Sequence, residues 1–153
     1  MKKIIILDFG SQYTQLIARR IRELEVFCEI WPFHRFSELH KIECSGVILS
    51  GSPASVHDKE PPTLSLDDIL VFPTLAICYG AQLLAHQKNG KVSRAHTREY
   101  GRAHLTHFND DILFEGIAQD SQVWMSHADT IVQLPENAEL IGSTEDVETA
   151  AYR

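Results

Sequence analysis

The sequence is poor in cysteine, and its cysteines and histidines lack the spacings that hold a metal ion. Three cysteines occur in 153 residues without a CxxC pair, and eight histidines occur without an HExxH motif. An odd number of thiols does not fit a secreted disulfide framework, and no metal site is predicted. Free thiols of this kind favour a reducing compartment, so we expect the protein to be cytoplasmic.

Long apolar runs and an excess of positive charge are missing too. The run Ile4–Leu7 ends at Asp8 after four residues, which is too short for the apolar region of a signal peptide. No other run approaches the length of a membrane span. Lys and Arg number 14 against 21 Asp and Glu, a formal net charge of -7. This balance disfavours binding to nucleic acid or to an anionic membrane, so neither is expected as a partner.

Strand-like and helix-like segments alternate in the first part of the chain. Short apolar runs bounded by glycine, proline or serine predict buried strands, and amphipathic stretches predict helices. The expected strands are residues 3–8, 26–31, 46–50 and 74–77, and the expected helices are residues 14–24, 63–72 and 79–88. This order predicts an α/β fold, with a mostly parallel central sheet and helices on both of its faces.

After Gly90 the pattern changes to short strands with little helix between them. The strands expected here are residues 92–96, 103–108, 123–126, 131–134 and 140–143. They predict antiparallel or mixed strands added to the sheet in the second half. The length predicts one domain over residues 1–153. Residues 149–153 have the pattern of an opening strand, so we expect this domain to be incomplete at its C-terminus.

Cys78 lies where a strand is expected to turn sharply into a helix. Apolar residues 75–77 lead into it, and Gly80 two places later tolerates the close approach that such a turn requires. This is the arrangement of a nucleophile elbow, with Cys in place of Ser. A thiol at a helix N-terminus faces the positive end of the dipole, which favours the thiolate. A buried cysteine packed under a helix is the alternative, and the pattern favours the nucleophile.

A second candidate group precedes Cys78 at the same edge of the sheet. Gly51 and Ser52 follow the strand 46–50, so their backbone should lie beside Cys78. Their N–H groups, with that of Tyr79, could form an oxyanion hole. An ordinary turn also explains glycine, serine and proline there, and the pattern alone favours the turn. A phosphate-binding loop is excluded, because neither GxxxxGK(S/T) nor GxGxxG occurs.

Polar and large apolar side chains gather at residues 124–129, Trp-Met-Ser-His-Ala-Asp. Such a cluster at a strand end could hold a polar ligand, but the pattern alone favours a surface loop in which Asp129 is a capping residue. Charged side chains nearby are interpreted as a solvated face, and they are Arg94, Arg98, Glu99 and Arg102.

Several of these stretches together resemble the triad, or class I, glutamine amidotransferases, and the resemblance runs from Ile4 to Arg153. The matching stretches are residues 7–20, 48–53, 77–82, 98–101 and 123–129. Cys-Tyr-Gly-Ala-Gln at 78–82 marks the class as a whole. Asp-Phe-Gly-Ser-Gln-Tyr at 8–13 and Val-Trp-Met-Ser-His at 123–127 point to the branch that serves GMP synthesis.

The resemblance implies a flavodoxin-like fold and glutamine hydrolysis by a cysteine nucleophile. Cys78 would attack the side-chain amide of glutamine, while the N–H groups of Tyr79 and of the Gly51–Ser52 turn face the oxyanion. The residues expected to hold the α-amino and carboxylate groups of glutamine are Gln82, Ser126, His127 and Asp129. Ammonia would pass to a synthetase (ATP pyrophosphatase) module, in cis or in trans, which uses ATP and Mg²⁺ to aminate XMP. No cofactor is expected in this chain itself.

The sequence departs from the family pattern in three ways. Ser52 and Ala128 stand where the family usually has glycine, and the downstream His-Pro-Glu motif, which carries the catalytic His and Glu, does not occur. Without that pair nothing orients a base toward Cys78, so the chain alone is expected to be inactive. Two alternatives remain. One is a glutaminase of another pathway, such as anthranilate or carbamoyl-phosphate synthesis, and the other is a non-catalytic domain that binds a partner.

Overall fold

The computed structural model describes residues 2–153, apart from the side chains of residues 96–99. Its contacts divide the chain into two compact units, one reaching Leu84 and one spanning Ala85–Arg153. We call them the N-terminal unit and the C-terminal unit, and each is described by itself. The single domain expected from the chain length stays a prediction.

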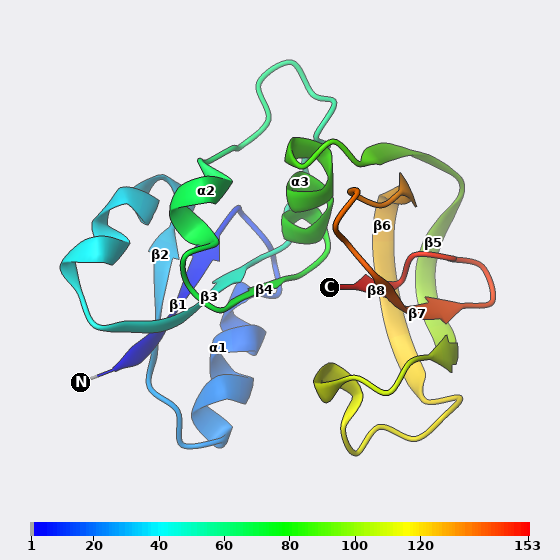
Figure 1. Ribbon diagram of the computed structural model, residues 1–153, viewed down its shortest axis with the longest axis horizontal. Coiled ribbons are helices and arrows are strands. Elements are labelled where there is room, and N and C mark those ends of the chain that lie inside the picture. The colour runs from blue at the N-terminus through cyan, green and yellow to red at the C-terminus, as the bar shows by residue number, and fades with distance from the viewer. Residues whose placement is uncertain (1) are drawn as a thin grey trace. The chain divides into compact units, whose positions relative to one another are not determined.

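A four-stranded parallel sheet forms the centre of the N-terminal unit (Figure 1). Its strands, in the order β2-β1-β3-β4, are β1 (Lys3–Asp8), β2 (Cys28–Pro32), β3 (Cys44–Leu49) and β4 (Thr74–Ala76). In β1, Ile6 is paired with Ile30 of β2 and with Ile48 of β3. The sequence predicts this sheet from apolar runs without polar alternation, which need burial on both faces, and the structure confirms it.

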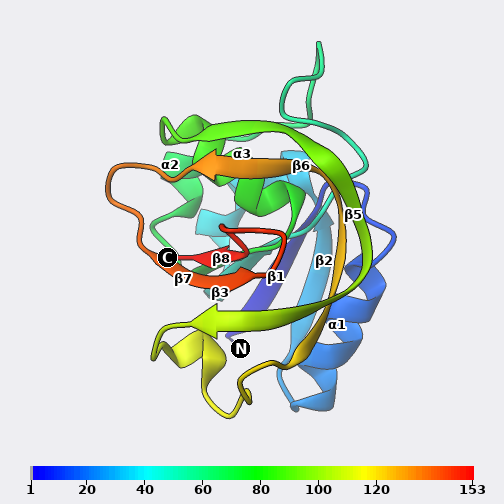
Figure 2. The same cartoon turned by 90° about the vertical axis from the view of Figure 1, so that its right-hand side faces the viewer.

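Helical segments cover both faces of this sheet. They are α1 (Thr14–Glu23), the 3₁₀ helix η1 (Phe33–Lys41), α2 (Leu66–Ile69) and the first part of α3 (Tyr79–Gln87). Ala18 of α1 is buried in a cluster with Ile6 and Ile48. Side chains alternate along a strand, so Ile5 and Leu7, which are fully buried, face the other side of the sheet. Figure 2 shows α1 on one side of the strands and α2 on the other.

Two helical segments differ from the expectation. The helix expected at residues 63–72 is reduced to α2, a single turn in which Leu66 and Ile69 are buried. A helix this short has little stability of its own, so tertiary contacts rather than propensity set its ends. The 3₁₀ helix η1 was not expected, because such turns occur in short pieces without a strong pattern of their own. Within the described residues, no helix combines the length and the apolar character needed to cross a membrane.

The C-terminal unit is built on an antiparallel sheet with the strand order β6-β5-β7-β8. Its elements are β5 (Lys91–Phe108), the 3₁₀ helix η2 (Ile112–Phe114), β6 (Gln122–Gln133), β7 (Leu140–Thr144) and β8 (Ala151–Tyr152). Figure 2 shows β5 and β6 as a long, strongly bent pair. Antiparallel strands agree with the expected fold class, although they form a sheet of their own rather than extending the parallel one.

Two long strands replace the four short ones expected at residues 92–96, 103–108, 123–126 and 131–134. β5 joins the first two segments and β6 joins the others. The register shifts between Arg94 and Glu99, and Gly101 has a φ of +126°. Such irregularities bend a strand without ending it. The residue pattern therefore predicts two separate strands where the structure has one continuous strand. Arg98 and Glu99, interpreted above as part of a solvated face, have side chains outside the described residues.

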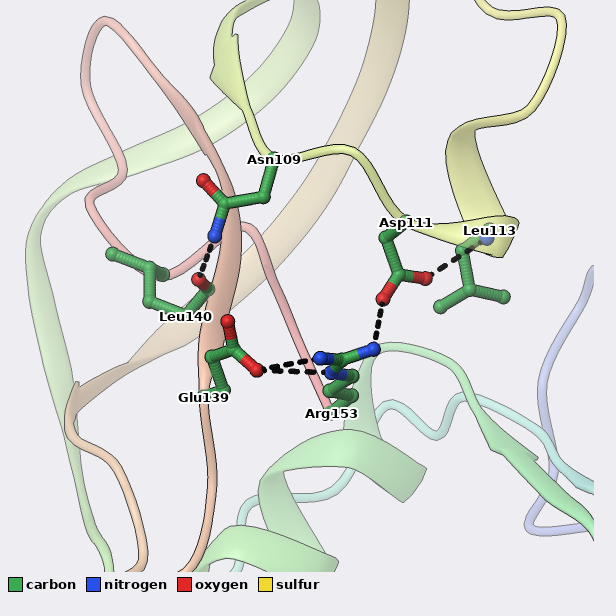
Figure 3. Close-up of polar contacts among 6 residues, drawn as sticks. All are labelled: Asn109, Asp111, Leu113, Glu139, Leu140 and Arg153. Carbon is green, nitrogen blue, oxygen red and sulfur yellow. Dashed lines mark hydrogen bonds and ion pairs between the residues drawn. The ribbon is translucent and has the colours of Figure 1, made fainter.

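β8 pairs with β7, and this confirms the strand expected at residues 149–153. The Arg153 guanidinium, just after β8, ties three segments together (Figure 3). It donates to the carboxylate of Glu139 at 2.8 and 3.0 Å and to that of Asp111 at 3.0 Å. Asp111 also accepts from the N–H of Leu113 at 2.9 Å, which caps η2.

Candidate active site

Cys78 lies on the turn between β4 and α3, with its backbone in the left-handed region. Its φ is +51°, a conformation that residues other than glycine adopt rarely and at a cost. Its side chain is exposed, whereas Cys28 is buried and Cys44 is partly buried. The alternative interpretation of Cys78 as a buried cysteine under a helix is therefore wrong. A strained turn that presents the sulfur to solvent is what a nucleophile elbow requires.

Gly80 permits this turn, because the start of α3 presses against the end of β3. A Cβ on Gly80 would lie 2.7 Å from Cβ and 2.8 Å from the carbonyl oxygen of Leu49. The N–H of Gly80 donates to the carbonyl oxygens of Ser50, at 3.1 Å, and of Ile77, at 3.0 Å. No side chain fits in that space, so packing around the elbow accounts for this glycine.

Gly51 brings the loop after β3 against the thiol. A Cβ on Gly51 would lie 3.4 Å from Cβ and 3.7 Å from Sγ of Cys78, as expected from the order of the strands. The buried hydroxyl of Ser50 fixes this loop, since it accepts from the N–H of Phe9 at 3.0 Å and donates to the carbonyl of Gly51 at 2.9 Å. Ser52 is not among the described residues with positive φ, so its side chain brings no backbone strain here.

The loop after β1 reaches the same place, a contact that the sequence analysis missed. Oδ1 of Asp8 organises this loop by accepting from the N–H groups of Gly10 and Ser11 and from the hydroxyl of Thr14, at 2.9, 3.3 and 2.8 Å. The Ser11 hydroxyl oxygen lies 3.5 Å from the position of a Cβ on Gly51. β1 and β3 are neighbours in the sheet, but the strand that follows β1 and the strand that follows β3 lie on opposite sides of this pair. In sheets of this kind ligands bind at the carboxyl ends of two such strands. That rule could have found Ser11.

Tyr79, the first residue of α3, is held through its ring and its hydroxyl. The ring is fully buried and packs on Phe9 with centroids 5.6 Å apart. The hydroxyl donates to the carbonyl oxygen of Pro62 at 2.6 Å. Burial, with the negative charge of Asp58, raises the pKa of Tyr79 to about 12. The first N–H groups of a helix have no acceptor within it, so the Tyr79 backbone supplies a donor beside Cys78.

Gln82 lies in the first turn of α3, four residues after Cys78. Its N–H donates to the carbonyl oxygen of Cys78 at 3.0 Å, and the residue is 7% exposed. This hydrogen bond places the backbone of Gln82 beside the residue that carries the thiol. The N-terminal unit therefore brings five candidates together, namely Cys78, Gly51, Ser52, Tyr79 and Gln82.

The three remaining candidates lie on β6 of the C-terminal unit. Ser126 is exposed and pairs with Tyr100 of β5, and His127 is half-buried. Asp129 is 6% exposed and lies opposite Arg94. The surface loop with a capping Asp129, favoured by the pattern alone, is wrong because these residues belong to a continuous strand.

The group around Cys78 combines an exposed thiol with backbone donors. The sulfur stands at the N-terminus of α3, where the helix dipole favours a thiolate. The N–H groups of Tyr79 and of the Gly51–Ser52 turn are in the segments that border the sulfur, and donors of this kind stabilise an oxyanion. Among the side chains that the structure describes, no three of His, Cys, Asp or Glu gather closely enough to hold a metal ion. The arrangement suits attack of sulfur on a carbonyl carbon.

A fold and a thiol site of this kind define a known class of protein. The family described as glutamine amidotransferase class-I matches residues 5–153, and the chain belongs to this family. It is 55% identical over 154 residues to a glutamine-hydrolysing GMP synthase of Bacteroides thetaiotaomicron, and 56% identical over 155 residues to that of Christiangramia forsetii. These alignments cover 99% and 98% of this chain, but the chain spans only 30% of the length of each relative.

Solved structures share the fold. A candidate GMP synthase subunit of Thermoplasma acidophilum has a TM-score of 0.84 and 28% identity, over 100% of this chain and 78% of its own. A glutamine amidotransferase of Thermotoga maritima has a TM-score of 0.78 and 22% identity, over 100% of this chain and 71% of its own. The expected α/β fold of the class I glutamine amidotransferases is confirmed.

Proposed function

We propose that this chain is the glutamine-hydrolysing part of a GMP synthase and releases ammonia from glutamine through Cys78. One observation carries the proposal. Cys78 is exposed, its backbone φ is +51°, and its Sγ lies 3.7 Å from the position that a Cβ on Gly51 would take. Strained residues persist at sites of chemistry more often than in ordinary turns. The 55% identity to a GMP synthase over nearly the whole chain supports the particular pathway.

The reaction begins with attack of the Cys78 thiolate on the side-chain amide carbon of glutamine. A bond forms between Sγ and that carbon, and the carbonyl π electrons move to oxygen, which gives a tetrahedral oxyanion. The N–H groups of Tyr79 and of the Gly51–Ser52 turn are assigned to this oxygen. Collapse with protonation of nitrogen expels ammonia and leaves a γ-glutamyl thioester. Water then hydrolyses the thioester to glutamate and restores the thiol.

The departing nitrogen needs a proton, and the 153 residues lack the motif expected to supply it. A positioned acid contributes about 10²–10⁴-fold, and the His-Pro-Glu motif usual in the family does not occur in this sequence. We therefore expect the chain by itself to release almost no glutamate. Cys78 should still react with electrophiles, since a thiolate is nucleophilic without a base.

Recognition of the α-amino and carboxylate groups of glutamine is assigned to Gln82, Ser126, His127 and Asp129. The buried carboxylate of Asp129 suits the α-amino group, and a charge-assisted hydrogen bond contributes about 1.5–3 kcal/mol. In the complete gene product, Asp129→Ala should therefore weaken synthesis from glutamine far more than synthesis from free ammonia. Parallel loss with both nitrogen sources would assign Asp129 to the fold instead.

The ammonia is proposed to reach a synthetase (ATP pyrophosphatase) module, in cis or in trans, that uses ATP and Mg²⁺ to convert XMP to GMP. Support comes from the GMP synthases above, because this chain matches only 30% of their length and the rest of each sequence lies outside the match. No residue of this chain is assigned to ATP or Mg²⁺. The cytoplasmic location expected from the free thiols stays a prediction.

The two alternatives have less support. A glutaminase of anthranilate or carbamoyl-phosphate synthesis does not account for identities of 55% and 56% to GMP synthases. A non-catalytic partner-binding domain does not account for a strained, exposed thiol with Gly51 beside it.

Release of glutamate and ammonia from glutamine, measured on the complete gene product, tests the proposal. Cys78→Ser should reduce this release by more than about 10³-fold, while GMP formation from free ammonia stays near wild type. Cys44→Ser is the matched control and should keep both activities. Glutamine use that survives in Cys78→Ser would contradict the proposal.

A further inference from the structure

A long loop starts at the candidate oxyanion donors and ends at α2. Residues 50–65 join β3 to α2 without a helix or strand in the described structure. Figure 1 shows this connection standing out above α2 and α3. Connections of this length inside a compact fold are uncommon and usually serve a site. What holds the loop therefore bears on the geometry beside Cys78.

Turns within the loop and contacts with the rest of the unit hold it, and its side chains Val56 and Leu64 are buried. Two contacts bear on its ends. At its start a local turn forms, in which the hydroxyl oxygen of Ser52 accepts from the N–H of Ala54 at 3.1 Å. On its far limb the carbonyl oxygen of Pro62 accepts from the hydroxyl of Tyr79 at 2.6 Å. The first contact shapes the loop locally, and the second joins it to the helix that follows Cys78.

The phenol of Tyr79 is well suited to be a permanent donor. Its ring is fully buried and packs on Phe9, which itself stacks on Phe33 with centroids 5.1 Å apart. Burial raises the pKa of Tyr79 to about 12, so the hydroxyl keeps its proton near neutral pH. It therefore acts as a tether and not as a base.

We propose that the Tyr79 hydroxyl is a positioning group for glutamine hydrolysis. It ties the far limb of the loop to the start of α3, so the N–H groups of Gly51 and Ser52 stay aligned with the oxyanion that forms beside Cys78. This inference rests on the proposed function. It gives a side-chain role to a residue otherwise assigned only its backbone N–H.

Tyr79→Phe removes the tether and keeps the buried ring. The loop then opens more often, so trypsin should cut several-fold faster after Lys59, which is exposed and lies three residues before Pro62. In glutamine hydrolysis, kcat should fall about tenfold while KM stays within about twofold, because oxyanion donors act in the transition state.

Alkylation by iodoacetamide separates the nucleophile from the oxyanion donors. Sulfur displaces iodide from carbon and no oxyanion forms, so the rate at Cys78 in Tyr79→Phe should stay within about twofold of wild type. Tyr13→Phe is the matched control, since Tyr13 is an exposed tyrosine of the same unit. It should leave proteolysis, hydrolysis and alkylation unchanged.

All three measurements use the complete gene product. A raised KM with unchanged kcat, a parallel fall of alkylation and hydrolysis, or wild-type cleavage after Lys59 in Tyr79→Phe would overturn the positioning role. A wild-type protein that releases no glutamate would overturn the proposed function itself. In that case cleavage after Lys59 still decides whether the tether exists.

Discussion

At the scale of single residues, strain and close packing meet at Cys78. Its φ of +51° costs on the order of 1–3 kcal/mol, and two backbone hydrogen bonds from Gly80 hold the turn on its other side. The conformation persists because the ends of β3 and β4 and the start of α3 all constrain it. An exposed sulfur in such a setting can be examined by chemical labelling and by small substitutions around it.

Cys78 is expected to be the thiol that a glutamine-like electrophile labels fastest. Cys28 is 1% exposed, and its Sγ lies 3.5 Å from the carbonyl oxygen of Ala18. Burial raises the pKa of Cys44, and a smaller thiolate fraction slows reaction near neutral pH. Peptide mapping after brief labelling measures the order, and equal labelling of the three thiols in the folded chain would contradict it.

Two glycines near the thiol should respond differently to the same added methyl group. In Gly80→Ala the Cβ would lie 2.8 Å from the carbonyl oxygen of Leu49, so the free energy of unfolding should fall by roughly 1–3 kcal/mol or more. In Gly51→Ala the nearest atom is Cβ of Cys78 at 3.4 Å, an ordinary contact. Its stability should stay within about 1 kcal/mol, while labelling of Cys78 slows because the methyl group occupies space beside Sγ.

Urea unfolding and the labelling rate of Cys78 together check this contrast. If Gly80→Ala unfolds at the wild-type urea concentration, the start of α3 moves away from β3 more easily than these distances indicate. If Gly51→Ala labels at the wild-type rate, the space beside the sulfur is not needed by the electrophile.

At the scale of elements, one ionic cluster joins β8, the segment before β7 and the start of η2. The side chain of Asp111 is 3% exposed and that of Arg153 is 61% exposed. The pair Arg153–Glu139 lies mostly in solvent, where ion pairs contribute little. The contact between Arg153 and the buried carboxylate of Asp111 is therefore the one that matters for stability.

Arg153→Ala is expected to lower the free energy of unfolding more than loss of the exposed partner Glu139 does, because the buried carboxylate of Asp111 loses a charged donor. Glu139→Ala, the control on the exposed side, should cost less than about 1 kcal/mol. In an Asp111→Asn background the Arg153→Ala change should cost much less, since no buried charge is left unpaired. Urea unfolding of the wild type, the two single variants and the double variant at Asp111 and Arg153 measures their coupling energy. Additive effects would mean that the two side chains do not depend on each other.

At the scale of the whole molecule, alkaline pH should destabilise both units through one tyrosine in each, Tyr79, which is buried, and Tyr152, which is partly buried. Burial raises the pKa of Tyr79 to about 12 and also raises the pKa of Tyr152. An unfolded tyrosine loses its proton near pH 10, whereas these two keep theirs in the folded state. The unfolded state therefore binds fewer protons above about pH 10, and stability falls as the pH rises from about 10 toward 12.

Urea unfolding between about pH 9 and 11 checks this dependence. Tyr79→Phe and Tyr152→Phe should each flatten the fall in unfolding free energy above about pH 10, because each removes one of the titrating groups. Below about pH 10 both tyrosines are protonated in the folded and in the unfolded state, so they cause no change of the unfolding free energy with pH there. Wild-type slopes in both variants would show that other groups cause the alkaline loss.

Local features of the sequence determined much of the N-terminal unit. An apolar run such as 3–8 has no polar alternation, and this alone predicts a strand buried on both faces. Gly80 two places after Cys78 marks an elbow, because the sharp turn and the glycine that permits it are neighbours in the chain. Consecutive parallel strands are usually neighbours in a sheet and end at the same edge, and this predicts that Gly51 lies near Cys78.

Only the tertiary structure decided the contacts between distant segments. The hydroxyl of Tyr79 meets the carbonyl of Pro62 across 17 residues, and Ser11 meets the Gly51 loop across the carboxyl edge of the sheet. Asp129 lies inside β6 and not in a loop, because the long strand bends with β5 instead of ending. Periodicity reports which faces of a segment are apolar, but the partner of each face depends on how separately formed elements pack together. For this reason the residues that hold the Cys78 loops in place emerge from the packing and not from the pattern.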